Sequence, residues 1–146
     1  MIDAELIKRK IKLINRDLKE LDRLGNLNFD QFQAKKEYEV LAERYLERII
    51  GRMIDINYHI LSNKNIIPSD YFSSFIEMGE QNYLPLELSQ SLANSAGLRN
   101  RLTHEYDEID ENQIYKAIGR ALKEVPQFLK YILQILDKES NQKRLF

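Results

Sequence analysis

The chain has 146 residues, of which 43% are hydrophobic and 31% charged, a balance typical of one ordinary folded domain. Its formal net charge of −1 argues against a general nucleic-acid coat protein without excluding RNA binding, and its lack of cysteine excludes disulfides, thiol nucleophiles and cysteine-based zinc sites. Five glycines and three prolines are too few for a turn-rich β fold, so we expect a single all-α domain over residues 1–146.

Apolar residues at helical spacing predict two long helices in the first half of the chain. The first spans residues 7–25, where apolar side chains recur every three or four positions. Asp30 and Gln33 have the spacing of a capping box, and the pattern behind them predicts one helix over residues 30–61. Gly51 interrupts that pattern, and it either weakens the helix or allows another helix to approach closely.

Two shorter helical segments follow. Ser69 or Asp70 can cap a short helix over residues 71–78. Pro85 occupies a favoured first-turn position of the next helix, whose small residues predict close packing against a neighbour. That helix leads directly into the segment that carries the candidate functional residues.

The last helix is predicted to begin near Asp110, which resembles the first residue of a second capping box with Gln113. Pro126 should kink or restart this helix because it removes one backbone donor. Residues 138–146 are polar and are expected to form a frayed tail. The predicted architecture is an antiparallel up-and-down bundle of four main helices plus one short helix.

Two histidines are present, His59 and His104, so a histidine-rich metal site within one chain is excluded. His59 lies on the long second helix and is interpreted as a partly buried structural residue with one satisfied nitrogen. Asp55, one turn earlier on the same face, could hydrogen-bond to it, which keeps a functional pair open as an alternative.

Residues able to do chemistry gather in the segment 98–106. Cleavage of an RNA phosphodiester without a metal needs a group that takes the proton of the 2′-hydroxyl, a donor for the leaving 5′ oxygen, and a cation for the developing negative charge. His104 fits the first two roles, and the guanidinium of Arg99 fits the third. Asn100 could orient either the phosphate or His104.

The spacing of Arg99 and His104 favours a site shared by two chains. On one straight helix these residues are about 140° apart, so one copy does not aim both at a single point. They converge if the helix ends near Thr103, or if two copies meet across a two-fold axis and supply an acid and a base. The product would then carry a 2′,3′-cyclic phosphate. An arginine and a histidine five residues apart also occur by chance at helix ends, where they need no catalytic role.

The segment 97–107 closely resembles the signature of HepT-like toxins, a branch of the HEPN superfamily of helical ribonucleases, and its sequence is GLRNRLTHEYD. The length, the all-α pattern and the place of the motif before the final helix are similar to that family as well. The resemblance implies a metal-independent endoribonuclease toxin that acts on tRNA or mRNA through Arg99, Asn100 and His104. Arg101 and Thr103 occupy variable motif positions and receive no catalytic role.

The resemblance also implies a homodimer and an antitoxin of the MNT nucleotidyltransferase type. That antitoxin would silence the toxin by binding it, or by transferring AMP from ATP to the motif tyrosine, here Tyr106. An added nucleotide would bring bulk and negative charge to the place that an RNA phosphate must occupy. No cofactor and no metal are expected.

A second hypothesis keeps the fold without the catalysis. The chain would then be a non-catalytic helical partner or nucleotide-binding subunit of a nucleotidyltransferase, with the arginine and histidine binding phosphate or forming an interface. In either case we expect a cytoplasmic protein, because no run approaches the roughly 20 apolar residues that span a bilayer and the N-terminus does not resemble a secretion signal.

Overall fold

A computed structural model describes residues 1–104 and 110–145 of the chain, and this part folds into six helices without a strand. Four helices are long: α1 (Ala4–Gly25), α3 (Lys36–Ser62), α5 (Leu86–His104) and α6 (Glu111–Leu145). Two are short: α2 (Phe29–Ala34) and α4 (Tyr71–Glu80). The predicted all-α class is therefore confirmed.

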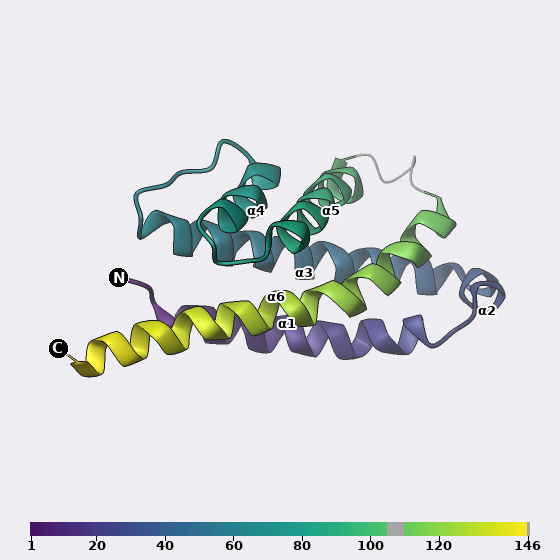
Figure 1. Ribbon diagram of the computed structural model, residues 1–146. Coiled ribbons are helices and arrows are strands. Elements are labelled where there is room, and N and C mark those ends of the chain that lie inside the picture. The colour runs from purple at the N-terminus through teal and green to yellow at the C-terminus, as the bar shows by residue number, and fades with distance from the viewer. Residues whose placement is uncertain (105–109, 146) are drawn as a thin grey trace.

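The helix α3 is the centre of the bundle. It packs against α1 and α6 on one side and against α4 and α5 on the other, and α1 and α6 lie side by side (Figure 1). The two chain ends lie together at one end of the bundle, whereas α2 lies at the opposite end (Figure 1). The C-terminal end of α5, which carries the candidate motif, lies over the middle of α3 (Figure 1).

The apolar stripes of these helices meet in one core. The α1 stripe keeps the predicted spacing, and its buried apolar residues are Ile7, Ile11, Ile14, Leu18, Leu21 and Leu24. The central helix α3 buries an even wider face, which includes Leu46, Ile49, Ile50, Met53, Ile54, Ile56, Ile60 and Leu61. Each such side chain contributes about 1.5–3 kcal/mol when it is fully buried, so this core holds the bundle together.

A buried ion pair fixes α1 against α3. The Asp17 side chain is nearly inaccessible, and its Oδ2 atom accepts a hydrogen bond from Nη1 of Arg52 at 2.6 Å. The same oxygen lies 3.2 Å from Nε of Arg48. Both arginines come from α3, and their charges compensate a carboxylate that would otherwise be costly to bury.

The single helix predicted over residues 30–61 is wrong, because two helices occupy this stretch. The capping box begins at Asn28, whose Oδ1 accepts from Gln31 N at 2.8 Å while the Gln31 side chain accepts from Asn28 N at 2.9 Å. Lys35 then adopts an extended backbone with φ −129° and ψ 118°, which ends α2 and precedes α3. The bundle therefore has two short helices, α2 and α4, whereas the sequence predicted only one short helix.

The packing of α2 explains this break. The change of direction lets α2 fold back over the end of the bundle, where Phe32 is almost completely buried. Its ring centroid lies 5.3 Å from that of Tyr115 on α6. Burying this aromatic ring stabilises the break, although the residues around Lys35 include neither glycine nor proline.

Residues 138–145, predicted to fray, are instead part of α6, which is helical to Leu145. Ile2 N donates a hydrogen bond to Oε1 of Glu139 at 3.3 Å, which connects the N-terminus to this last part of the helix. The helix also continues through Pro126 without a restart, and Figure 1 shows it bending between its green and yellow parts.

Several predicted helix ends are confirmed. The first helix ends at Gly25. Asp70 caps α4 by accepting from Ser73 N at 2.7 Å, and Asp110 accepts from Gln113 N at 2.8 Å at the start of α6. Among the helices described, none combines the length and the apolar character needed to cross a membrane.

Candidate functional site

The motif residues lie on the last turns of α5, which pack near the middle of α3 beside Glu47 and Gly51 (Figure 1). Asn100 and His104 are exposed, one turn apart on the same helix face, whereas Arg99 is half-buried. The helix includes His104, so in a regular helix His104 still points about 140° away from Arg99. Tyr106, the predicted modification site, lies outside the described residues.

Arg99 occupies a slot between α3 and α4. On the α3 side, a Cβ atom built on Gly51 would lie only 3.2 Å from Nε of Arg99. On the α4 side, the guanidinium carbon of Arg99 lies 5.3 Å from the centroid of the Tyr71 ring. The glycine within α3 therefore does allow a close approach, and the group that approaches is the predicted catalytic cation.

Arg99 has an uncompensated charge within the part of the chain that the structure describes. No carboxylate of residues 1–104 or 110–143 lies within ion-pair distance of it, and its buried Nε has no hydrogen-bond partner there. Partial burial of a cation without a partner is costly, and the face of Tyr71 offsets only part of that cost. The slot therefore holds a cation that an anionic group can approach.

The aromatic wall of the slot is supported from behind. The ring of Tyr58 on α3 meets the ring of Tyr71 edge-on, with 6.2 Å between their centroids. Burial raises the pKa of the Tyr58 phenol, with smaller contributions from Tyr71 and Asp70, so this group stays neutral at physiological pH. Asp70 caps the same turn of α4, and the hydrogen bonds it accepts from Ser73 lower the pKa of its carboxyl.

Thr103 connects the motif helix to α3. Its hydroxyl lies 2.9 Å from the carbonyl oxygen of Arg99, one turn earlier on α5, and 3.2 Å from Oε1 of Glu47 on α3. No catalytic role was predicted for this variable motif position, and its contacts in the structure are packing contacts at the end of α5. Residue spacing alone could not have revealed the contact between Thr103 and Glu47, because only the fold brings these two residues close together.

His59 and Asp55 take part in structural contacts instead of forming a functional pair. Nε2 of His59 accepts a hydrogen bond from Asp3 N at 2.9 Å, as expected for a histidine with one satisfied nitrogen. Asp55 lies 3.1 Å from Nζ of Lys10 on α1, so its partner is not His59. Both residues attach the N-terminal part of the chain to α3.

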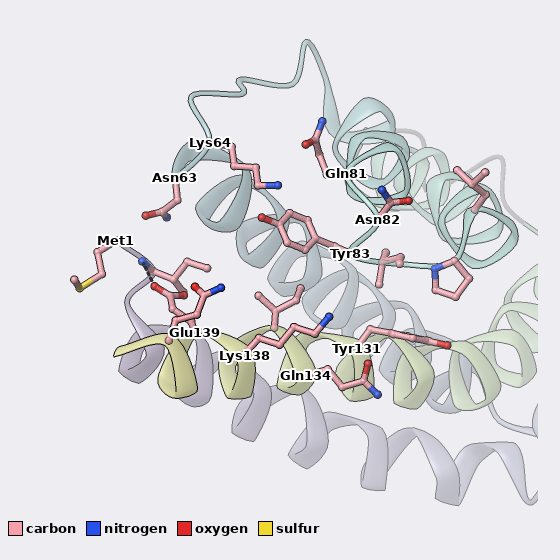
Figure 2. A pocket seen from close by; sticks show the side chains of 16 residues that line it. Met1, Asn63, Lys64, Gln81, Asn82, Tyr83, Tyr131, Gln134, Lys138 and Glu139 are labelled. Carbon is pink, nitrogen blue, oxygen red and sulfur yellow. Dashed lines mark hydrogen bonds between the residues drawn. The ribbon is translucent and has the colours of Figure 1, made fainter. Parts of the chain in front are cut away.

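A large cavity lies at the opposite end of α5 (Figure 2). Its volume is about 910 Å³, and its lining includes Lys64, Tyr83, Lys138 and Glu139. Nζ of Lys64 lies 4.9 Å from the centroid of the Tyr83 ring. The first residue of α5 contributes to this cavity, about 27 Å along the helix from His104. Since its described lining includes no histidine and no motif residue, it is not the candidate site.

A second hollow, with a volume of about 710 Å³, lies beside the motif between α5 and α6. We call it the α5–α6 groove, and its lining consists of Leu98, Arg101, Gln113, Lys116, Gly119, Arg120 and Lys123. The sequence did not predict it, although the spacing of the three α6 cations on one helix face is a signal that could have done so. Among the described residues, no group of three or more potential ligands could hold a metal ion.

Comparison with known proteins gives a family and close relatives. The family model described as "Ribonuclease HepT-like" matches residues 14–132. The chain is 40% identical over 132 residues to the tRNA nuclease HepT of Aphanizomenon flos-aquae, with 90% of each protein covered. It is 28% identical over 131 residues to the mRNA nuclease HepT of Shewanella oneidensis, with 88% of this chain and 96% of that protein covered.

Solved structures show the same fold. A chain in a crystal structure of a toxin–antitoxin with AMP-PNP gives a TM-score of 0.83 at 25% identity, with 90% of this chain and 99% of that chain covered. A chain in the structure of the tri-AMPylated Shewanella oneidensis HEPN toxin in complex with MNT antitoxin gives a TM-score of 0.81 at 27% identity, with 92% and 99% covered.

Proposed function

Because the chain belongs to the HepT-like ribonuclease family, we propose that it is the toxin of a toxin–antitoxin pair and cleaves RNA as a metal-independent endoribonuclease. The proposed substrate is tRNA or mRNA, the two RNA classes named in the descriptions of its relatives. The proposed site of action is the cytoplasm. The catalytic residues of this proposal are Arg99, Asn100 and His104.

The observation that carries the proposal is the uncompensated cation in the slot. Arg99 is half-buried against Gly51 and Tyr71, and no described carboxylate neutralises it. A guanidinium held in this way stabilises the negative charge that develops on phosphoryl oxygens during cleavage. A half-buried guanidinium that no described carboxylate neutralises is suited to binding an anionic phosphate.

The proposed reaction is an internal transesterification. His104 of one subunit takes the proton of the 2′-hydroxyl, and the resulting oxygen attacks the adjacent phosphorus. The bond from phosphorus to the 5′ oxygen breaks, and His104 of the second subunit gives that oxygen its proton. The products carry a 2′,3′-cyclic phosphate and a 5′-hydroxyl. Asn100, exposed one turn before His104, orients the phosphate or the imidazole.

A homodimer is part of this proposal, because the α5 geometry does not aim Arg99 and His104 at one point within a single chain. Exposed aromatic side chains beside the slot support it. Tyr71, which contacts Arg99, is 40% exposed, and its neighbour Phe72 is 48% exposed. Covering these rings with a second copy would bury apolar surface and bring two motif helices toward each other.

Neutralisation is proposed to depend on an MNT-type nucleotidyltransferase, which binds the toxin or transfers AMP to Tyr106. The relative from Shewanella oneidensis supports this step, since it is described as tri-AMPylated and in complex with an MNT antitoxin. Tyr106 follows His104 by two residues, so a nucleotide attached there adds negative charge beside the proposed catalytic histidine.

The first experiment compares RNA cleavage by the wild type with that of Arg99→Ala and His104→Ala. Each variant should cleave at least about 100-fold more slowly, because each removes a group that acts in the transition state. Lys12→Ala, which removes an exposed cation of α1, is the control and should cleave as the wild type does. Circular dichroism and gel filtration establish that each variant keeps its helices and its oligomeric state. Full growth inhibition by both motif variants would refute the proposed catalysis.

The second experiment measures the intact mass of the chain after incubation with ATP, Mg²⁺ and the neighbouring nucleotidyltransferase. We expect mass gains in multiples of one AMP, and no gain in Tyr106→Phe. An unchanged mass together with a stable complex would mean that neutralisation occurs by binding. Gains that persist in Tyr106→Phe would place the modification on a different residue.

A further inference from the structure

The α5–α6 groove contains a concentration of positive charge that the proposed catalysis does not use. Four of its seven lining residues are cations: Arg101, Lys116, Arg120 and Lys123. The described lining includes no carboxylate, although the whole chain has a net charge of −1. Within the residues that the structure describes, this face is therefore locally basic.

The groove cations are exposed and lack protein partners in the described part of the chain. None of the four lies within ion-pair distance of a carboxylate of residues 1–104 or 110–143. Some cations elsewhere are paired, as Lys10 is with Asp55 and Lys36 is with Glu39. Glu124, the acidic residue of α6 next to the groove, has a different partner, because it accepts a hydrogen bond from the hydroxyl of Ser91.

The geometry of α6 makes the groove a linear site. Lys116, Arg120 and Lys123 are spaced four and three residues apart, so they form one row that extends about 10 Å along the helix. Gly119 lies in the same row, and a Cβ atom added there would have no described atom within 4 Å. Like charges in one row repel each other, and a ligand with several negative charges in a line relieves that repulsion.

The position of the groove connects it to the motif. Arg101 forms part of its α5 wall and lies between Asn100 and His104 in the chain. An RNA strand whose reacting phosphate is at Arg99 and His104 would place its neighbouring phosphates within reach of Arg101 and then of the α6 row. The described lining contains no aromatic residue, so the contacts available there are to the RNA backbone and not to stacked bases.

We propose that the α5–α6 groove binds the sugar–phosphate backbone of the RNA substrate next to the cleavage site. This inference rests on the proposed ribonuclease function and extends it, since it assigns Arg101, Lys116, Arg120 and Lys123 to substrate binding. The contacts are to phosphates, so they give affinity and register without reading the sequence.

The test measures binding of a fluorescent single-stranded RNA across a range of salt concentrations, in a His104→Ala background that prevents cleavage. Lys116→Gln with Arg120→Gln removes two groove charges. The control, Lys8→Gln with Lys12→Gln, removes two exposed cations of α1 at the same helical spacing. The groove pair should weaken binding more than about tenfold at 50 mM salt and reduce the slope of log K against log salt by about 1.4. The control pair should change neither quantity appreciably.

A kinetic measurement in the otherwise wild-type chain gives the second readout. The groove pair should raise KM for RNA by about tenfold, while kcat at saturating RNA falls less than about twofold, because the removed charges act in binding. Equal losses for the groove pair and the control pair would overturn the proposal, since only net charge would then matter. So would a groove pair that binds RNA normally but no longer binds the nucleotidyltransferase, which would make the groove a protein interface.

The two proposals can fail separately in this design. If no variant or wild type cleaves RNA but the groove pair still lowers the salt slope, the ribonuclease function fails and the groove remains an RNA-binding site. If the wild type cleaves RNA and the groove pair keeps both the KM and the slope of the wild type, the ribonuclease function remains and the groove proposal is refuted.

Discussion

Gly51 and Arg99 share one slot, since a Cβ atom on Gly51 would lie 3.2 Å from Nε of Arg99. The predicted catalytic cation is thus placed by the central helix of the bundle, well away from it in sequence. Any side chain at position 51 competes with Arg99 for space, and this gives the proposed mechanism a test that leaves the motif itself intact.

The first prediction concerns graded filling of this slot. Gly51→Ala should raise the free energy of unfolding by up to about 1 kcal/mol through helix propensity, yet displace Arg99 by a few tenths of an ångström and lower cleavage severalfold. Gly51→Leu should displace Arg99 fully and lower cleavage by about 100-fold. Thermal unfolding and single-turnover cleavage measure the two effects separately.

Gly97→Ala is the matched control for this prediction. Gly97 is an exposed residue of α5 close to the motif, and a Cβ atom there would have no described atom within 4 Å. Its substitution should add the same helix propensity without a loss of cleavage. Wild-type cleavage by Gly51→Leu would show that the position of Arg99 in the slot has no bearing on catalysis.

The second prediction concerns the aromatic wall. A cation–π contact at an exposed site contributes about 0.5–1 kcal/mol, so Tyr71→Ala should lower kcat/KM by about two- to fivefold. Tyr71→Phe keeps the ring and should cleave as the wild type does. If Tyr71→Phe loses as much activity as Tyr71→Ala, the phenol hydroxyl is the important group and the contact with the ring face is not.

The third prediction concerns pH and the cap of α4. Hydrogen bonds from Ser73 lower the pKa of the Asp70 carboxyl in the folded state. Because the carboxyl pKa of Asp70 is lower in the folded chain than in the unfolded chain, the ionised carboxylate stabilises the fold at pH values above the unfolded pKa of about 4. This stabilisation disappears as the pH falls through the pKa of the folded state. Asp70→Asn keeps an acceptor for the cap but does not titrate. When the pH is lowered from 7 to 3, the Tm of the wild type should therefore fall more than the Tm of Asp70→Asn. A constant difference would contradict the assignment.

The fourth prediction concerns the buried ion pair between α1 and α3. Asp17→Ala leaves Arg48 and Arg52 without their carboxylate and should lower the free energy of unfolding by about 3–5 kcal/mol. Arg16→Ala is the control, because Arg16 is 60% exposed and lies 3.9 Å from Asp17, and its effect should stay within about 0.5 kcal/mol. Urea denaturation followed by circular dichroism measures both changes. A loss of less than 1 kcal/mol in Asp17→Ala would show that the pair adds little to stability.

Much of the fold was predictable because helical spacing and capping residues are local signals. The end of α1 at Gly25 and the caps at Asp70 and Asp110 follow directly from them. The break at Lys35 was not predictable in this way, since it depends on Phe32 packing against Tyr115 from the last helix. The helical end of α6 was also missed, because polar composition does not by itself end a helix.

The sequence predicts which residue types form the candidate site but not what surrounds them. The motif identified Arg99, Asn100 and His104, and Gly51 was recognised as a place where another element could approach. The partner in that approach and the wall made by Tyr71 depend on how α3, α4 and α5 pack, which spacing within one helix does not reveal. The α5–α6 groove was missed for the same reason, since Arg101 joins the α6 cations only in the folded chain.

The slot at Gly51 also affects how members of this family are sorted into active and inactive proteins. A homologue that keeps the whole motif but has a bulky residue at the position of Gly51 would still be identified as a ribonuclease from its motif, although its arginine would have lost its place. Genome surveys that count functional toxins from the motif would then include proteins already inactivated by one distant substitution. Under the proposed mechanism, the residue at this position of the central helix is therefore a second criterion for an intact enzyme.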